Sequence, residues 1–313
     1  MKRFLLAFGL LLLVYTINAQ DYKHVDSIVD NYPKRFKSIK SFSDRISFDF
    51  KSDLDKTRAA YYWVSNNISY DFESFYSVRN SGYSYETEAE LLQIQMTYAE
   101  DVLKNKSAVC EGYSQLLKFT LRNLDINCEV VDGYAKTEIK EIGRVNHQDN
   151  HAWNAVYLDN KWQLMDATWS TGNEYGNPGH FEFDDAYFLT NSEDMIWSHF
   201  PSDKKWQLID EPVSKLAFFY APIMHHGYYD SGLVLSEMKG SKKSGKFIEI
   251  SFENIDETKT YDYIFPEKSN FIEPIQFERK GKFFVAKIPY SSANGRELII
   301  FDDRKACLSF KIR

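Results

Sequence analysis

The chain has 313 residues, with 38 Lys and Arg against 45 Asp and Glu, so its formal charge is −7. Apolar residues make up 43% and charged residues 27%, which is typical of a folded globular protein and excludes a disordered chain. The acidic balance argues against nucleic acid as a partner, because phosphate binding needs an excess of Lys and Arg on one face. At roughly 150 residues per domain, this length predicts two domains.

The beginning of the chain has the pattern of a signal peptide. Lys2 and Arg3 precede an apolar stretch over residues 4–14, and Ala19 offers a small residue at a cleavage site. This stretch is shorter than the ~20 residues of a membrane span, although an uncleaved anchor is an alternative. We therefore predict a signal peptide over residues 1–19, no membrane span after its cleavage, and an exported protein that is periplasmic, secreted or at the cell surface.

The next part of the chain is predicted to contain helices and then an antiparallel sheet. Residues 22–50 are a mixed lead-in, in which Pro33 interrupts a short helical pattern. Ser52 is a candidate N-cap for the first longer helix. Apolar spacing predicts helices over 52–67, 88–104 and 111–123, followed by strands over 128–133, 151–158 and 161–168. Helices followed by strands indicate an α+β fold.

After about residue 212 the pattern changes to short strands separated by turn-forming residues. These predicted strands cover 247–252, 259–265, 282–288, 297–301 and 307–312. Their spacing is typical of a small β-sandwich. The predicted organisation is therefore a signal peptide over 1–19, an α+β domain over 20–212 and a β-sandwich domain over 213–313.

Three cysteines cannot all pair within one chain. Cys128 and Cys307 both lie in strand-like sequence, and the sequence leaves open whether they form a disulfide. Cys110 differs because it stands at the junction of a loop and a predicted helix. The N-terminus of a helix carries about half a positive charge and unpaired N–H groups, which favour a thiolate and can bind an oxyanion. The alternative is that Cys110 is simply a core residue near the helix cap.

A predicted hairpin provides a partner for this cysteine. The two-residue connection Asp159-Asn160 pairs Leu158 with Lys161 and places His151 opposite Thr168. Asp166 then lies on the same face, within side-chain reach of His151. A carboxylate in this position orients an imidazole as a general base.

A metal site at His147, Asp149 and His151 is a weaker alternative, because their spacing lacks a known ligand framework. We predict no metal and no cofactor.

Three segments in this order resemble the transglutaminase-like superfamily, whose Cys–His–Asp triad lies on a papain-like fold. They are Val109-Cys-Glu-Gly-Tyr113, His151-Ala-Trp-Asn154 and Leu164-Met-Asp-Ala-Thr-Trp169. Residues 55–64 and 67–71 resemble its bacterial members, and residues 187–190 and 197–208 resemble a branch related to kyphoscoliosis peptidase. The resemblance covers about residues 50–215.

The resemblance implies that Cys110 is the nucleophile, His151 the base and Asp166 the residue that orients it. Trp153 and Trp169 flank these residues and are candidate walls of a substrate cleft, with core packing as the default. The papain signature around the cysteine is absent, and no Gln for the oxyanion site can be placed.

These features predict an exported, cysteine-dependent amide hydrolase or acyl transferase that acts on peptides or proteins. Hydrolysis is favoured, because water is the default acceptor of the acyl group. One alternative is a transglutaminase that cross-links Gln to amines. Another is a catalytically silent cell-surface module, whose C-terminal domain binds a glycan or a protein.

Overall fold

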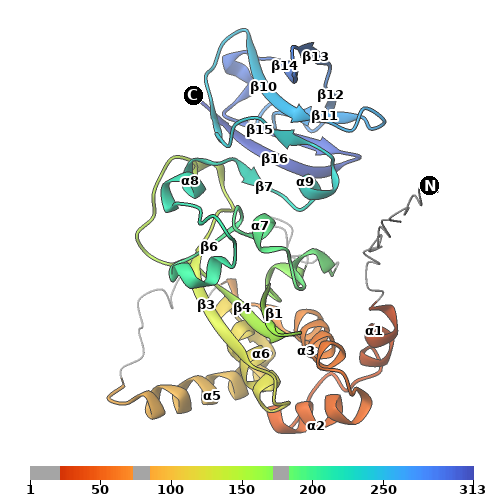
Figure 1. Ribbon diagram of the computed structural model, residues 1–313, viewed down its shortest axis with the longest axis vertical. Helices are drawn as coiled ribbons and strands as arrows, with labels where there is room; N and C mark the ends of the chain where they lie inside the picture. Colours follow the sequence, from red (N-terminus) through yellow and green to blue (C-terminus); the bar gives the residue numbers. More distant parts are fainter. Residues whose placement is uncertain (1–21, 73–84, 172–182) are drawn as a thin grey trace, which may run out of the picture.

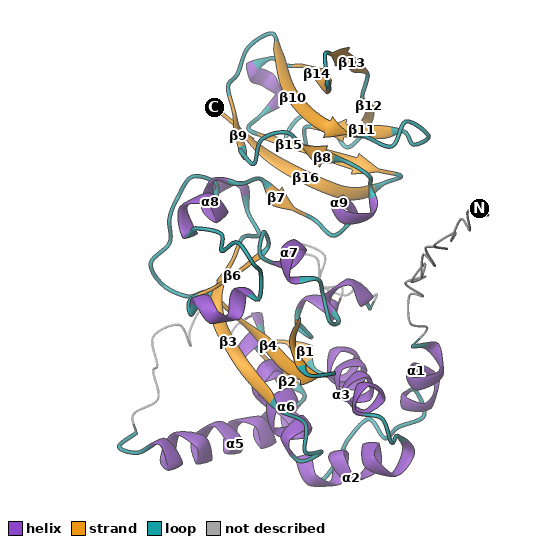
Figure 2. Cartoon of the chain, viewed as in Figure 1, coloured by secondary structure: helices purple, strands orange, loops and turns teal. Residues whose placement is uncertain are grey.

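The structure is a computed structural model that describes residues 22–72, 85–171 and 183–313 (Figure 1). The predicted signal peptide lies outside these residues. Among the described helices, none is both long and apolar enough to cross a lipid bilayer. Most of the helices and a first sheet form the lower part of the molecule in Figure 2, and further sheets with a few short helices form its upper part.

The first half of the chain is mainly helical, as predicted. Its helices are α1 (Lys23–Val29), α2 (Ile39–Asp49), α3 (Asp53–Asn67), α5 (Glu88–Asn105) and α6 (Cys110–Arg122). Ser52 caps α3 by accepting a hydrogen bond from the N–H of Asp55, which confirms the predicted start of that helix. The sequence analysis missed α2, which begins after a similar cap at Ser38. Two short strands, β1 (Ser69–Tyr70) and β2 (Ser107–Ala108), pair in parallel just before α6.

An antiparallel sheet packs against α6. Its order is β5-β4-β3-β6, with β3 (Cys128–Ala135), β4 (His151–Leu158), β5 (Lys161–Met165) and β6 (His199–Pro201). Leu158 pairs with Lys161, which confirms the predicted hairpin register. The ladder ends at Met165, earlier than predicted, because the N–H of Asp166 bonds to the carbonyl of Tyr187 instead. Asp166 therefore lies just beyond the strand.

Short elements connect this sheet to the rest of the molecule. They are the 3-10 helices η2 (Ile139–Glu141), η3 (Trp169–Thr171), η4 (Asp185–Tyr187) and η5 (Lys204–Gln207), and the helices α7 (Ser192–Met195) and α8 (Lys215–Tyr220). Phe218 and Phe219 of α8 share a core with Tyr134 and Phe200. Helix α8 thus packs with the first sheet, and the change of core comes after it. The domain boundary expected at residue 212 remains a prediction.

The C-terminal part contains two further sheets. Their elements are β7 (Ile223–Met224), α9 (Gly227–Asp230), β8 (Val234–Leu235), β9 (Ser241–Lys242), β10 (Phe247–Asn254), β11 (Tyr261–Ile264), β12 (Glu273–Pro274), β13 (Phe277–Lys280), β14 (Phe283–Pro289), η6 (Ser292–Asn294), β15 (Glu297–Asp302) and β16 (Lys305–Ile312). One sheet has the order β13-β14-β10-β8, the other β12-β11-β15-β16-β7, with β9 added in parallel to β16. Side chains from both sheets form one core. The predicted α+β fold class with a C-terminal antiparallel sheet region is thus confirmed.

The three cysteines lie apart from one another. All three are buried free thiols, and Cys128 and Cys307 belong to different hydrophobic cores. The disulfide that the sequence left open is therefore not formed. Only Cys110 begins a helix.

Candidate active site

Cys110 is the first residue of α6, and only Val109 separates it from β2. Strand β2 is fixed by its parallel pairing with β1, where Tyr70 lies beside Ala108. Gly112 allows the start of α6 to pack closely, since a Cβ there would lie 2.5 Å from the Cβ of Ala108. The sulfur is thus held at the N-terminal end of a helix, whose dipole favours negative charge.

His151 is the first residue of β4, and its partner across the ladder in β3 is Gly133. The imidazole Nε2 lies 2.5 Å from Oδ2 of Asp166. This bond leaves Nδ1 as the ring nitrogen available to Cys110, whose side chain lies close enough to the ring to raise its pKa. The imidazole therefore connects the sulfur of Cys110 with the carboxylate of Asp166.

Asp166 is completely buried, with 0% of its surface exposed. Its Oδ1 accepts hydrogen bonds from the N–H of Thr168 at 2.8 Å and of Trp169 at 3.1 Å. Its Oδ2 lies 2.5 Å from Nε2 of His151 and 3.0 Å from Nε2 of His199. A carboxylate accepts about four hydrogen bonds, so the acceptor sites of Asp166 are filled. A charged group can be buried when its hydrogen-bonding sites are all occupied in this way.

The environment fixes the charges of this pair. Burial lowers the pKa of His151, but the attraction of Asp166, their hydrogen bond and the contact with Cys110 outweigh it and raise the pKa to about 10. Burial raises the pKa of Asp166, but His151 and His199 hold it well below its usual range. At neutral pH the His151 ring is therefore an imidazolium and Asp166 is a carboxylate.

The sequence analysis did not identify His199 as a site residue. It is the first residue of β6, is 1% exposed, and reaches Asp166 from 33 residues further along the chain. Its Nδ1 lies 2.8 Å from Oγ of Ser198. Burial lowers the pKa of His199 despite the opposing effect of Asp166, so this ring is neutral at pH 7.

The two tryptophans expected at the cleft both lie close to these histidines and differ in how deeply they are buried. Trp153 is 1% exposed, and its ring centroid lies 5.9 Å from that of His151. It packs in the interior with Val131 and does not line an open surface. Trp169 is only partly buried, and its ring centroid lies 5.7 Å from that of His151. A contact between Trp169 and substrate remains a prediction.

His151, Asp166 and His199 also form a ligand set of the kind that binds zinc or iron, with ligand atoms within 4.8 Å of one another. However, Oδ2 of Asp166 is 2.5 Å and 3.0 Å from the two Nε2 atoms, which are direct hydrogen-bond distances. An ion at about 2.0–2.2 Å from each ligand would have to break both bonds. The geometry therefore fits direct hydrogen bonds from the two histidines to Asp166 and not a metal centre.

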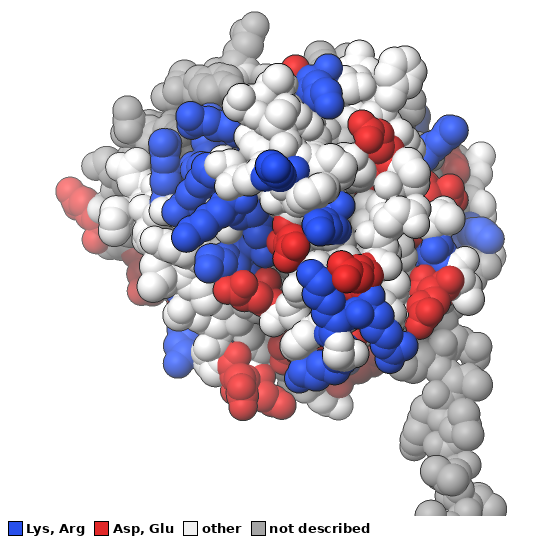
Figure 3. All heavy atoms as spheres, turned by 90° about the horizontal axis from the view of Figure 1, so that it is seen from above, with Lys and Arg blue, Asp and Glu red and all other residues white. Residues whose placement is uncertain are grey.

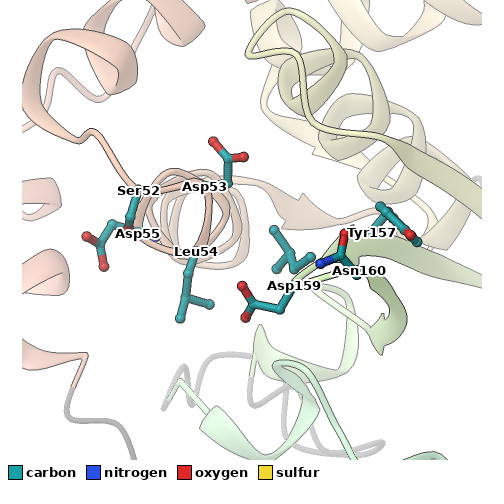
Figure 4. A pocket seen from close by; sticks show the side chains of 8 residues that line it. Ser52, Asp53, Leu54, Asp55, Tyr157, Asp159 and Asn160 are labelled. Atoms are coloured by element: carbon teal, nitrogen blue, oxygen red, sulfur yellow. Dashed lines mark hydrogen bonds between the residues drawn. The ribbon is translucent and has the colours of Figure 1, made fainter.

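A surface cavity of about 570 Å³ lies elsewhere in the fold (Figure 4). It is lined by residues 52–55 at the start of α3 and by residues 157–160 at the β4–β5 turn. This turn is at the opposite end of β4 from His151, about 24 Å away for an extended strand of this length. We do not assign this cavity to the site around Cys110.

The structure thus brings Cys110, His151 and Asp166 into one connected chain, and adds His199 behind the carboxylate. A thiol, an imidazole and an orienting carboxylate in this order can generate a thiolate nucleophile and return a proton to a leaving group.

Comparison with known proteins finds a family model and several similar proteins. Residues 40–167 match the family model described as the transglutaminase-like superfamily. Kyphoscoliosis peptidase of Mus musculus is 31% identical over 186 residues, which cover 58% of this chain and 26% of that protein. Lim and transglutaminase domain protein ltd-1 of Caenorhabditis elegans is 27% identical over 221 residues, covering 64% of this chain and 28% of that protein. The chain spans about a quarter of the length of these relatives.

Among solved structures, one described as a TGase matches 54% of this chain and 37% of its own. The sequence identity is 22% and the TM-score is 0.29.

Proposed function

We propose that the protein, whose residues 40–167 match the family model of the transglutaminase-like superfamily, is a cysteine-dependent amide hydrolase or acyl transferase. Its substrates are peptides or proteins, and its reacting groups are Cys110, His151 and Asp166. The observation that carries the proposal is the continuous contact from the Cys110 thiol through the His151 ring to the buried Asp166 carboxylate.

The reaction follows from the charges of these groups. The Cys110 thiolate attacks the carbonyl carbon of an amide and forms a C–S bond. The C–N bond then breaks while His151 donates its proton to the leaving amine, which leaves a thioester on Cys110. Water adds to this thioester and gives a proton to His151, and the carboxylic acid departs with the thiolate restored. Asp166 holds the tautomer of His151 and stabilises its positive charge throughout.

Hydrolysis is the outcome that we favour, because water is present in any open site and a second amine needs a site of its own. If a primary amine reaches the thioester first, the same enzyme forms a new amide bond and acts as a transglutaminase. We also propose that the protein is exported, on the basis of residues 1–19, and that its C-terminal sheets bind a glycan or protein partner.

The test is an incubation of the mature protein with a peptide library, with and without a fluorescent primary amine. Products are analysed by mass spectrometry. Cleavage without amine incorporation is the expected result, and incorporation at Gln would instead assign the transglutaminase reaction. Both must disappear in Cys110→Ala. Neither product from the wild-type protein, or equal product from the variant, would overturn the enzymatic proposal in favour of a silent binding module.

A further inference from the structure

We propose that His199 is a positioning residue for the site, which fixes the Asp166 carboxylate while Ser198 selects the tautomer of His199 that can do so. His199 bonds to Asp166, and no contact of His199 with Cys110 is found among the described residues. It acts on the chemistry through Asp166 and His151. The proposal rests on the proposed function for its effect on turnover, whereas its effect on the reactivity of Cys110 can be measured without any substrate.

The tautomer of His199 follows from its two partners. Asp166 is ionised and can only accept hydrogen bonds, so Nε2 of His199, at 3.0 Å from Oδ2, must carry a proton. The ring is neutral, and therefore Nδ1 has a lone pair. The Ser198 hydroxyl can donate to this Nδ1 at 2.8 Å while it also donates to the carbonyl of Met195 at 3.1 Å. Ser198 thus keeps the proton of His199 on the nitrogen that faces Asp166.

This bond determines how the carboxylate is oriented. Oδ1 is held by two backbone N–H groups, and Oδ2 lies between Nε2 of His151 and Nε2 of His199. If the second donor were lost, only His151 would hold Oδ2, and the carboxylate would be free to tilt toward or away from that ring. The angle of the His151 ring, and with it the approach of Nδ1 to Cys110, would no longer be fixed.

The surroundings make His199 rigid enough for this role. Strand β6 pairs His199 with Ala135 of β3. The ring of Trp169 lies 4.4 Å from the His199 ring between centroids, and that of Trp153 lies 5.2 Å away edge-on. The His199 side chain is therefore fixed by a strand on one side and by aromatic rings around it.

The other titratable groups around Asp166 do not compete with His199 for this role. Cys110 lies beyond the His151 ring. Tyr61 of α3 donates its hydroxyl to the backbone carbonyl of Asp166 at 2.9 Å. Burial raises the pKa values of both Tyr61 and Tyr113 of α6, so both remain neutral phenols across the pH range of interest. No Lys or Arg is an ion-pair partner of Asp166 among the described residues.

Two substitutions distinguish positioning from simple packing. The amide nitrogen of Gln can occupy the place of imidazole Nε2, so His199→Gln keeps the donor to Asp166. The amide of Asn reaches only the place of Nδ1, so His199→Asn keeps the contact with Ser198 and loses the donor. His225→Asn is the matched control, because His225 is half-buried and, like His199, is bonded to a serine, at 2.9 Å from Oγ of Ser309 in the C-terminal sheets.

The measurement is the rate of alkylation of Cys110 by iodoacetamide between pH 4 and 10, followed by intact mass, together with a melting curve for each variant. We expect His199→Gln and His225→Asn to match the wild-type profile. His199→Asn is expected to slow alkylation at neutral pH by about 10–100-fold, as the loss of a hydrogen bond that orients a functional side chain commonly does. It should also move the acidic limb of the profile to higher pH, because the His199 bond helps to hold the pKa of Asp166 low.

Equal profiles for His199→Asn and His199→Gln, in variants with unchanged melting temperature, would overturn the proposal. If His199→Asn does not fold, His199→Gln becomes the deciding variant. An alkylation profile of His199→Gln that differs from that of the wild type would contradict the assigned donor. These outcomes are separate from the proposed function. Absence of peptide turnover by the wild-type protein would refute the enzymatic proposal, while the alkylation profiles would still decide the role of His199.

Discussion

At the scale of single residues, the protonation of His151 is set by Asp166. The carboxylate accepts from Nε2 at 2.5 Å, so the lone pair of a neutral ring can only be on Nδ1, facing Cys110. Asp166→Asn reverses this, because the amide would present N–H to Nε2 and force the proton onto Nδ1. We expect kcat to fall by about 10³–10⁴-fold with the fold retained, as for other triads with the wrong tautomer. Steady-state kinetics would show this, with the exposed Asp159→Asn as the control variant. A change below tenfold would contradict the assigned role of Asp166.

The raised pKa of His151 predicts a pH dependence with a definite sign. A folded-state pKa of about 10 means that the imidazolium persists through neutral pH and loses its proton only near pH 10. Turnover that needs His151 to protonate the leaving amine is expected to stay high to about pH 9 and to fall above it. The stabilisation from this proton is likewise complete below pH ~6.5 and lost as the pH rises through 10. A kcat profile that fell already between pH 6 and 7 would contradict this charge state.

The sequence was sufficient to predict three of the four residues in the series Cys110, His151, Asp166 and His199. Cys110 was recognisable from its place before a helix, and Asp166 from the register of a two-residue hairpin with His151. His199 could not be found in this way, because β6 has only three residues and no local spacing relates it to Asp166. The depth of Trp153 in the fold could not be predicted for a related reason, since it depends on how fully β4 is covered.

At the scale of elements, the site depends on how closely α6 approaches α5. A Cβ on Gly112 would lie 2.9 Å from Oη of Tyr98 and 2.9 Å from Cγ2 of Val102. Gly112→Ala is therefore expected to push the start of α6 outward and to destabilise the protein by about 1–3 kcal/mol, as overpacking does. Urea unfolding measures this, and Gly245→Ala, with no atom nearer than 3.4 Å, is the matched control. Equal stability of the two variants would show that the contact is not tight.

The longer elements were predictable because their apolar side chains repeat with a clear period. Helices α3, α5 and α6 and strands β3 and β4 lie within a few residues of their predicted ranges. The apolar spacing did not predict α2, because Pro33 interrupts the helical pattern shortly before the helix that follows Ser38. It also failed for strands of two to four residues such as β7 and β13, which are set by pairing with distant neighbours.

At the scale of the whole molecule, Lys136 joins the first sheet to the segment that enters the C-terminal sheets. It is 2% exposed, and its Nζ donates to the carbonyls of Phe218, Ala221 and Pro222 at 2.5, 3.0 and 3.2 Å. Lys136→Met would leave these carbonyls without that donor, and we expect a loss of about 1–3 kcal/mol in the free energy of unfolding.

The pH dependence of that loss is a sharper test of the same residue. Burial lowers the pKa of Lys136 to about 7. Its contribution to stability is therefore fully present above the usual lysine pKa of ~10.4 and is lost as the pH falls through 7. The difference between wild type and Lys136→Met in urea unfolding should widen from pH 6 to pH 9. A constant difference would mean that Lys136 titrates normally.

The arrangement of two parts was predictable from the change in pattern along the chain, since helices and a sheet give way to short strands. What the sequence did not indicate is that α8 packs with the first sheet through Phe218 and Phe219. This contact depends on Tyr134 and Phe200, which come from two different strands, and no local pattern relates them.

The most direct test of the whole account is the order and pH dependence of cysteine alkylation in the folded protein. At pH 6, iodoacetamide is expected to label Cys110 alone, and faster than any cysteine in the urea-unfolded chain, because a positively charged His151 ring and the start of α6 both favour negative charge on the sulfur. His151→Ala should abolish this advantage. Labelling of Cys110 in the folded protein no faster than in the unfolded chain would contradict an active thiolate at the start of α6.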